Sequence, residues 1–222
     1  MSSFIVAIDG PAASGKSTVS RKAAALLGGV HVDSGALYRG LTWQCQRTGI
    51  DCHDEAAVLR AMRDLRMEFF LDGNSVRFTI DGKDPGAEIR SEAVGEQVSA
   101  VAAMPRVREW IVERLRSMTG FGSLVMEGRD IGTVVFPDTP FKFYLDADPE
   151  ERARRRQGDL AAANGVSSIS RVKTSLTRRD ALDSGRATAP LARAADARVI
   201  DTTGLSIDEV VAVVVDAVRV AR

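Results

Sequence analysis

The stretch Gly10-Pro11-Ala12-Ala13-Ser14-Gly15-Lys16-Ser17 stands between an apolar run at residues 4–8 and a helical pattern. It fits G-x-x-x-x-G-K-[ST], the pattern of a P-loop, whose backbone N–H groups surround phosphate oxygens. In such a loop the lysine reaches the β- and γ-phosphates, and the hydroxyl of the next residue ligates Mg²⁺. Since a strand precedes the stretch and a helix follows it, a chance match is a poor explanation. The sequence therefore predicts that Lys16 and Ser17 bind a nucleoside triphosphate with Mg²⁺.

The helix after this loop is expected to point its N-terminal dipole at the anion. Its apolar residues Val19, Ala23, Leu26 and Leu27 recur at helical spacing, which predicts that this face packs on the core. The loop residues expected to contact the triphosphate are Gly10, Ala12, Ala13, Ser14, Gly15, Lys16, Ser17 and Thr18.

Composition restricts the partners. The 222 residues suffice for one α/β domain with insertions, and 30 basic residues balance 30 acidic ones. Because no net charge favours nucleic acid or an anionic membrane, we expect small-molecule partners and a monomer.

No signal segment or apolar run of about 20 residues is found, which predicts a cytoplasmic protein. Cys45 and Cys52 lack metal-site spacing and are interpreted as reduced thiols.

Five apolar segments resemble buried parallel strands, and helical patterns separate them. The expected strands are residues 4–8, 29–32, 123–126, 141–145 and 198–200. This alternation predicts an α/β fold with a five-stranded parallel sheet flanked by helices, and ligands at the carboxyl ends of the strands.

Residues 67–80 interrupt the alternation. Two short strand patterns there are joined across Asp72-Gly73-Asn74, which is typical of an antiparallel hairpin. Helical patterns lie on both sides of it, at residues 58–65 and 94–101. We interpret the hairpin as part of an insertion that forms a lid or a substrate-binding module.

Arginines distinguish a kinase from other P-loop proteins. Arg39, Arg129 and Arg186 lie in Gly- and Asp-containing loops, at the expected ends of strands and starts of helices. The planar guanidinium binds phosphate oxygens bidentately, so three around one acceptor phosphate would position it for phosphoryl transfer. For any one of them a surface salt bridge is the alternative.

A second basic group lies in the helix expected at 149–158. Its residues Arg152, Arg155 and Arg156 would close over the triphosphate as a lid, with Arg155 stabilising charge on the transferring group. The alternatives are a solvated helical face and, more remotely, an RNA-binding patch.

Four segments together resemble the bacterial cytidylate kinases, almost from end to end. They are Gly10–Thr18, Asp33-Ser-Gly-Ala-Leu-Tyr-Arg39, Glu127-Gly-Arg-Asp-Ile-Gly-Thr-Val-Val-Phe-Pro137 and Arg179-Asp…Asp183…Arg186…Pro190-Leu191. The second and third are highly specific. The resemblance implies ATP + (d)CMP → ADP + (d)CDP.

The resemblance also implies roles for individual residues. Ser34, Arg39, Arg129 and Arg186 would meet CMP, the three arginines at its phosphate; Ser99, Arg108 and Asp130 would read cytosine; Arg179 and Asp183 would hold the sugar. The implied division is core with P-loop at 1–60, monophosphate-binding insertion at 61–103, core at 104–151, lid at 152–166 and core at 167–222, in one catalytic domain.

Base recognition by Asp130 is chemically reasonable, because cytosine carries an N4 amino donor where uracil carries an oxygen. One or two mismatched buried contacts, each about 1–3 kcal/mol, would disfavour UMP. Asp9 and Asp33, at expected strand ends, either touch the hydration shell of Mg²⁺ or cap a helix or turn.

Three alternative functions are considered. One is a P-loop kinase for UMP, dTMP or a non-nucleotide acceptor; the trio Ser99, Arg108 and Asp130, interpreted as reading the base, would have no purpose with a non-nucleotide acceptor. A regulatory GTPase is disfavoured, because Asp201-Thr-Thr-Gly204 comes late in the chain and no N-K-x-D is present. The third is a degenerate kinase whose insertion binds a protein, against which the intact Lys16 and Ser17 argue.

Overall fold

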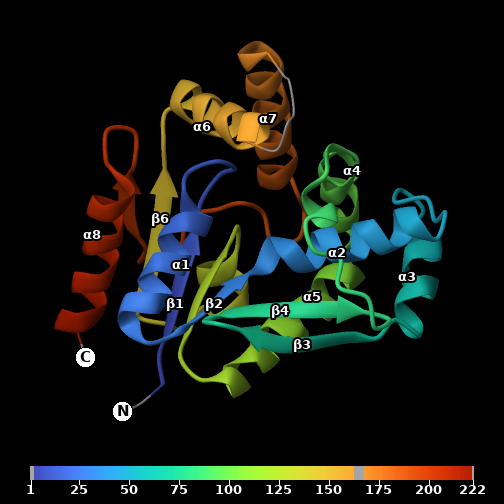
Figure 1. Cartoon of the computed structure of the whole chain (residues 1–222), viewed down its shortest axis with the longest axis horizontal. Coiled ribbons are helices and arrows are strands. Elements are labelled where there is room, and N and C mark those ends of the chain that lie inside the picture. The colour runs from blue at the N-terminus through green and yellow to red at the C-terminus, as the bar shows by residue number, and fades with distance from the viewer. Residues whose placement is uncertain (1–2, 163–167, 222) are drawn as a thin grey trace.

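A computed structural model describes residues 3–162 and 168–221 (Figure 1). Its centre is a sheet in which five parallel strands lie side by side. Their order is β2 (Val30–Asp33), β5 (Leu124–Gly128), β1 (Ile5–Asp9), β6 (Phe141–Asp146) and β7 (Arg198–Asp201). The inner strands are almost wholly buried because helices cover both faces of the sheet. The predicted α/β fold with five parallel strands is confirmed.

The antiparallel hairpin is also confirmed, and it extends the same sheet. Strand β3 (Met67–Asp72) pairs with β4 (Ser75–Ile80), and β4 meets β2 through the single pair His31 and Ser75. Within the described residues the sheet therefore has seven strands, in the order β3-β4-β2-β5-β1-β6-β7.

Two apolar cores lie on opposite faces of the sheet, since alternate residues of each strand point to opposite sides. On one face, α1 (Lys16–Leu27) and α8 (Ile207–Val220) pack over β1 and β6. On the other, α2 (Ser34–Arg47), α3 (Glu55–Arg63), α4 (Glu92–Ala103) and α5 (Pro105–Ser117) surround the larger core. Short helical turns are η1 (Glu88–Arg90), η2 (Met118–Phe121) and η3 (Ile131–Val135).

Local sequence explains how several helices begin. The side chains of Asp33, Asp54 and Ser91 each accept a hydrogen bond from a backbone N–H in the first turn that follows. Ser206 and Glu209 form a capping box at α8.

One detail of α1 was predicted wrongly. Val19 and Ala23 are buried as expected, but the side chain of Leu26 is 55% exposed. The buried face instead includes the small residues Ser20 and Ala24, and the last turn before Gly28 is the exposed end of the helix.

Helices α6 (Pro149–Ala162) and α7 (Ile169–Ser184) form a unit above the carboxyl ends of the strands (Figure 1). Helix α6 is longer than the sequence predicted, since it continues past Gly158. Residues 163–166 of the expected lid lie outside the described residues.

Gly40 of α2 allows this helix to approach the hairpin closely. A Cβ at this position would lie 2.7 Å from the ring of Phe78, which is buried on β4. We predict that Gly40→Ala lowers the free energy of unfolding by about 1–3 kcal/mol, because the two elements must separate. Urea denaturation followed by circular dichroism measures this.

The matched control is Gly95→Ala in α4, where, apart from the chain neighbours and the backbone of its own helix, no atom of the described residues lies within 4 Å of the added Cβ. Here alanine should stabilise the helix by about 0.5–1 kcal/mol through its helix propensity. Equal effects of the two substitutions would contradict the close approach of α2 and the hairpin.

Candidate active site

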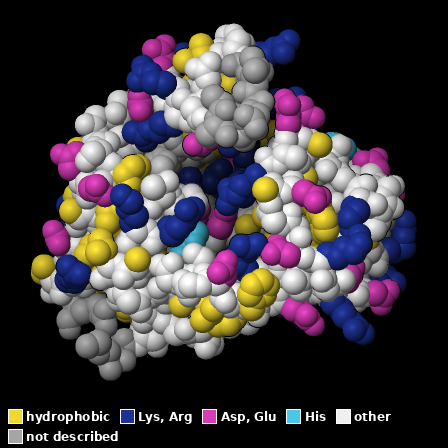
Figure 2. Space-filling model, viewed as in Figure 1, with side chains coloured by type: hydrophobic (Ala, Val, Ile, Leu, Met, Phe, Trp, Pro, Cys, Tyr) yellow, Lys and Arg dark blue, Asp and Glu magenta, His cyan; other side chains and the backbone are white. Residues whose placement is uncertain are grey.

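A cavity of about 590 Å³ opens at the carboxyl ends of the parallel strands. It lies between the P-loop, the helices α2, α4 and α5, and the unit formed by α6 and α7. Figure 2 shows a hollow below that unit in which dark blue Lys and Arg side chains gather. Of the predicted site residues, those that line the cavity are Ala12, Ala13, Ser14, Gly15, Lys16, Ser17, Thr18, Ser34, Arg39, Ser99, Arg108, Arg129, Asp130, Arg155, Arg156, Arg179, Asp183 and Arg186.

The P-loop has the conformation that its glycines permit. Gly10 and Gly15 have φ angles of 148° and 91°, and a Cβ on Gly10 would lie 2.0 Å from the carbonyl oxygen of Leu145. Gly10 does not line the cavity. Because it has no Cβ, it allows the chain to approach the backbone of β6 closely. Ala13 also has a positive φ, 59°, which is costly for a residue with a Cβ.

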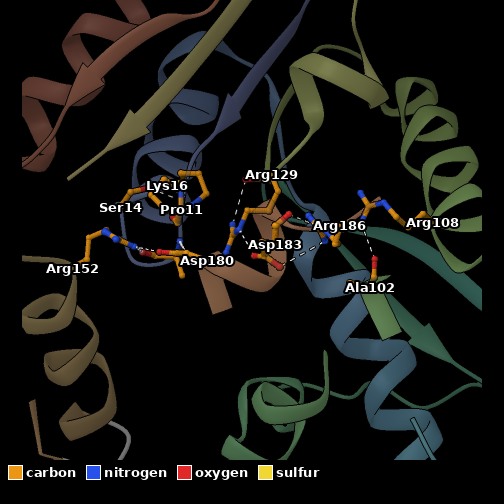
Figure 3. Close-up of polar contacts among 12 residues, drawn as sticks. Pro11, Ser14, Lys16, Ala102, Arg108, Arg129, Arg152, Asp180, Asp183 and Arg186 are labelled. Carbon is orange, nitrogen blue, oxygen red and sulfur yellow. Dashed lines mark hydrogen bonds and ion pairs between the residues drawn. The ribbon is translucent and has the colours of Figure 1, made fainter. Parts of the chain in front are cut away.

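The side chain of Lys16 is buried within the loop. Its Nζ donates to Pro11 O at 2.6 Å and to Ser14 Oγ at 3.3 Å (Figure 3). Burial, and then repulsion from Arg129, lowers the pKa of Lys16 to about 7. An anion bound beside it would favour the charged ammonium.

Asp9 and Asp33 are both capping residues. Asp9 accepts hydrogen bonds from the N–H groups of Ile131 and Gly132 at 2.8 and 2.7 Å, and burial raises its pKa to about 6. Asp33 caps α2 through Ala36 N–H at 3.0 Å.

The carboxylate of Asp33 also pairs with two arginines at the cavity. Its Oδ2 lies 2.8 Å from Arg90 and 3.7 Å from Arg39. Burial alone would raise the pKa of Asp33, but the two guanidinium groups outweigh it and lower the pKa to about 2. The carboxylate therefore holds two arginines at the rim.

A second carboxylate links two arginines deeper in the cavity. Asp183 of α7 lies 3.0 Å from Nε of Arg129 and 3.7 Å from Nη1 of Arg186 (Figure 3). Arg179, one turn earlier on α7, has its pKa lowered to about 9 by burial and by the nearby Arg129 and Arg39. Cationic groups are thus crowded on this side.

The third pair lies between α5 and the loop after β5. Arg108 and Asp130 form a buried ion pair, and Arg108 also donates to Ala102 O at 3.1 Å. The guanidinium carbon of Arg108 lies 5.2 Å from the ring centroid of Tyr38. Ser99 of α4 also lines the cavity.

Several arginines keep a buried nitrogen that has no hydrogen-bond partner among the described residues. These atoms are Nη1 of Arg39, Nε of Arg108, Nε of Arg179 and Nη2 of Arg186. Buried donors are normally satisfied, so this concentration in one cavity indicates a ligand rich in acceptor atoms.

The predicted lid arginines separate in the structure. Arg155 and Arg156 line the cavity; Arg155 donates to Thr202 Oγ1 and Thr202 O at 2.9 and 2.6 Å. Arg152 does not line it. Instead it pairs with Asp180 of α7 and donates to the carbonyl oxygens of Ala12 and Ala147.

Sequence reasoning assigned no role to several residues of this region. They are Tyr38, Arg90, Glu127, Glu151, Asp159, Asp180 and Thr202. Glu127 could have been found from its place at the end of a buried strand, beside Arg129. Burial, and then Asp33, raises its pKa, while the hydroxyl of Ser17 acts in the opposite direction. Nothing local in the sequence identifies the others.

Comparisons with known proteins point to one family. A family model described as cytidylate kinase matches residues 6–220. The chain is 47% identical over 206 residues to the cytidylate kinase of Geobacillus kaustophilus, covering 93% of this chain and 92% of the relative. It is 46% identical over 220 residues to that of Mycobacterium leprae, covering 99% and 97%. A bifunctional pantoate ligase/cytidylate kinase from Synechococcus elongatus is 46% identical over 211 residues, which are 93% of this chain and 40% of that protein.

The Arg108–Asp130 pair gives a prediction about stability. Arg108→Met leaves a carboxylate that is 7% exposed without its cation, so the free energy of unfolding should fall by about 3–5 kcal/mol. Thermal and urea denaturation measure the change. Arg106→Met, at an exposed position of the same helix, is the control and should change it by less than about 0.5 kcal/mol. Similar losses in both variants would show that the buried pair has no special weight.

Proposed function

This chain belongs to the cytidylate kinase family, and from this membership we propose that it transfers the γ-phosphoryl group of ATP to CMP and dCMP. One observation carries the proposal at this site. The P-loop and a group of arginines with buried nitrogens that lack a hydrogen-bond partner among the described residues line the same cavity. The cavity therefore offers binding groups for two phosphate-bearing ligands.

The donor side is the P-loop. Backbone N–H groups of Ala13 to Thr18 and the Nζ of Lys16 would surround the β- and γ-phosphates of ATP. Lys16 would exchange its hydrogen bond to Pro11 O for one to phosphate. Arg155 and Arg156 of α6 line the same end and would offset charge on the transferring group, while Arg152 lies outside the cavity.

Mg²⁺ fits the oxygen donors beside this loop. The hydroxyl of Ser17 and the carboxylate of Glu127 both line the cavity and lie close enough for the hydroxyl to affect the pKa of the carboxylate. Mg²⁺ prefers such hard oxygen ligands and keeps several waters. When held by Ser17 and Glu127, the ion would supply positive charge that offsets the charge of the phosphates.

On the acceptor side, Arg39, Arg129 and Arg186 would bind the phosphate of CMP. Asp33 and Asp183 hold these guanidinium groups in place through ion pairs, so little side-chain entropy is lost on binding. An oxygen of that phosphate would then attack the γ-phosphorus as the bond to the β–γ bridging oxygen breaks. A general base is not required, because the acceptor phosphate is already ionised at pH 7.

The base and sugar would occupy the remaining wall. Asp130, held by Arg108, would accept from the N4 amino group of cytosine, with Ser99 beside it. Arg179 and Asp183 would bind the ribose side, and Ser34 lies at the start of α2 near the phosphate group. UMP would oppose an oxygen to Asp130, so it should be a poor substrate.

We also propose a single chain acting in the cytoplasm, where ATP and nucleoside monophosphates are available. One chain lines the cavity on both the donor and the acceptor side. No helix in the described part of the chain is long and apolar enough to cross a membrane. The division into a core, a monophosphate-binding insertion at 61–103 and a lid at 152–166 is part of the same proposal.

The direct test is a coupled assay of ADP release with Mg-ATP and CMP, dCMP, UMP, dTMP or AMP. We expect turnover with CMP and dCMP, and at least about tenfold lower kcat/KM with UMP, since one mismatched buried contact costs this much. Lys16→Ala should abolish turnover, whereas Lys22→Ala, an exposed lysine of the same helix, should not. Equal activity with UMP would indicate a broader pyrimidine kinase. Silence with all five acceptors would contradict the proposal.

A second prediction concerns the acceptor phosphate. Arg39→Ala should raise KM for CMP by about tenfold or more, because a charge-assisted contact is lost, and leave KM for ATP within about twofold. Steady-state kinetics with each substrate varied in turn measures the split. Arg47→Ala is the control, since this arginine of α2 bonds to Gln44 outside the cavity. A defect confined to ATP would place Arg39 on the donor side.

A further inference from the structure

Arg152 and Asp180 bind the two backbone polar groups of one P-loop residue, Ala12, from outside the cavity. Asp180 Oδ1 accepts from Ala12 N–H at 3.1 Å, and Arg152 Nη1 donates to Ala12 O at 3.2 Å. The two side chains are ion-paired to each other through Asp180 Oδ2 (Figure 3). Both polar groups of Ala12 are therefore bound, one by each helix of the α6–α7 unit.

Apolar contacts reinforce this arrangement. Ala12 packs in a small cluster with Ala153 of α6 and with Val172 and Leu176 of α7, and Ala13 packs against the cluster. The side chains of Arg152 and Asp180 are only 11% and 17% exposed. Removing either partner of an ion pair that is largely shielded from solvent leaves an uncompensated charge and destabilises the structure.

The next residue shows why the loop needs support. Ala13 has a φ of 59°, a left-handed conformation that costs a residue with a Cβ roughly 1–2 kcal/mol. Such a conformation persists only when its surroundings impose it. The N–H groups from Ala13 onward are those proposed to surround the phosphates, so the bound backbone of Ala12 fixes where this stretch of the loop begins.

We propose that Asp180 and Arg152 are positioning residues that preorganise the P-loop for the triphosphate through Ala12. Neither side chain lines the cavity, so their effect passes through the loop and does not require contact with the nucleotide. Arg152 also neutralises a carboxylate that would otherwise repel the incoming phosphates. The inference deepens the proposed function and differs from the sequence prediction that Arg152 itself binds ATP.

A mutant cycle distinguishes an indirect effect of Arg152 through Asp180 and the P-loop from direct contact between Arg152 and ATP. Arg152→Met leaves the carboxylate of Asp180 without its cation beside the P-loop, and we expect the Kd for ATP to rise about tenfold. Adding Asp180→Asn removes that charge and keeps an oxygen that can accept from Ala12 N–H. The double variant should therefore recover most of the lost affinity. If Arg152 contacts the triphosphate directly, the double variant will bind as weakly as R152M, and the proposal is wrong.

The hydrogen bond to Ala12 is tested separately on Asp180. Asp180→Ala removes it and should raise the Kd for ATP about tenfold, whereas Asp180→Asn should stay within about threefold. KM for ATP should follow the Kd, and KM for CMP should change much less. Wild-type affinity in D180A would overturn the proposal, and this comparison remains decisive if R152M fails to fold.

Calorimetric titration with ATP, well below the melting temperature of each variant, provides the Kd without turnover. Loss of melting temperature at unchanged Kd would show a merely structural role and would contradict the proposal. Lys173→Met is the matched control, because Lys173 and Glu150 form an exposed ion pair between the same two helices at 3.2 Å. If the wild type binds ATP but does not phosphorylate CMP, the proposed function fails while the cycle still tests the positioning role.

Discussion

The repulsion among arginines crowded at the carboxyl ends of the strands is the constraint that shapes this molecule. Like charges that lie close together oppose folding unless carboxylates lie between them. Asp33 holds two arginines at the rim, Asp183 holds two in the interior, and Asp130 holds Arg108. Each of these carboxylates lies on or beside an element end, so the fold and the site depend on the same ion pairs.

The sequence predicts well those features that local patterns determine. Buried parallel strands are nearly continuous apolar runs, and the P-loop is a contiguous segment whose glycines have steric reasons for their positions. Caps such as Asp33 and Ser206 act within one turn. For these reasons the five strands and the hairpin follow from the printed residues. The resemblance to cytidylate kinases added most of the acceptor-side residues, which composition and spacing could not provide.

The missed features depend on distant contacts. Asp180 meets Ala12 across 168 positions of sequence, and no local signal separates Asp180 from its neighbours. Arg152, Arg155 and Arg156 look alike in one basic run, yet helical geometry turns the first toward the P-loop backbone and the others into the cavity. The prediction that Leu26 packs on the core was wrong for a different reason: its spacing is helical, but the helix end on which it lies is exposed. The union of the hairpin with the main sheet likewise depends on a pairing that the sequence does not reveal.

The junction between that hairpin and the sheet has a mechanical consequence. Strand β4 meets β2 at one residue pair, with the N–H of His31 also bonded to Asn74 O at 2.7 Å, whereas β1 and β5 pair along five positions. Loosening the hairpin from the parallel strands therefore breaks few backbone hydrogen bonds. In the terms of native-state hydrogen exchange, the backbone junction protects the hairpin little, and the packing of Phe78 and Ile80 in the larger core is what holds β4 in place.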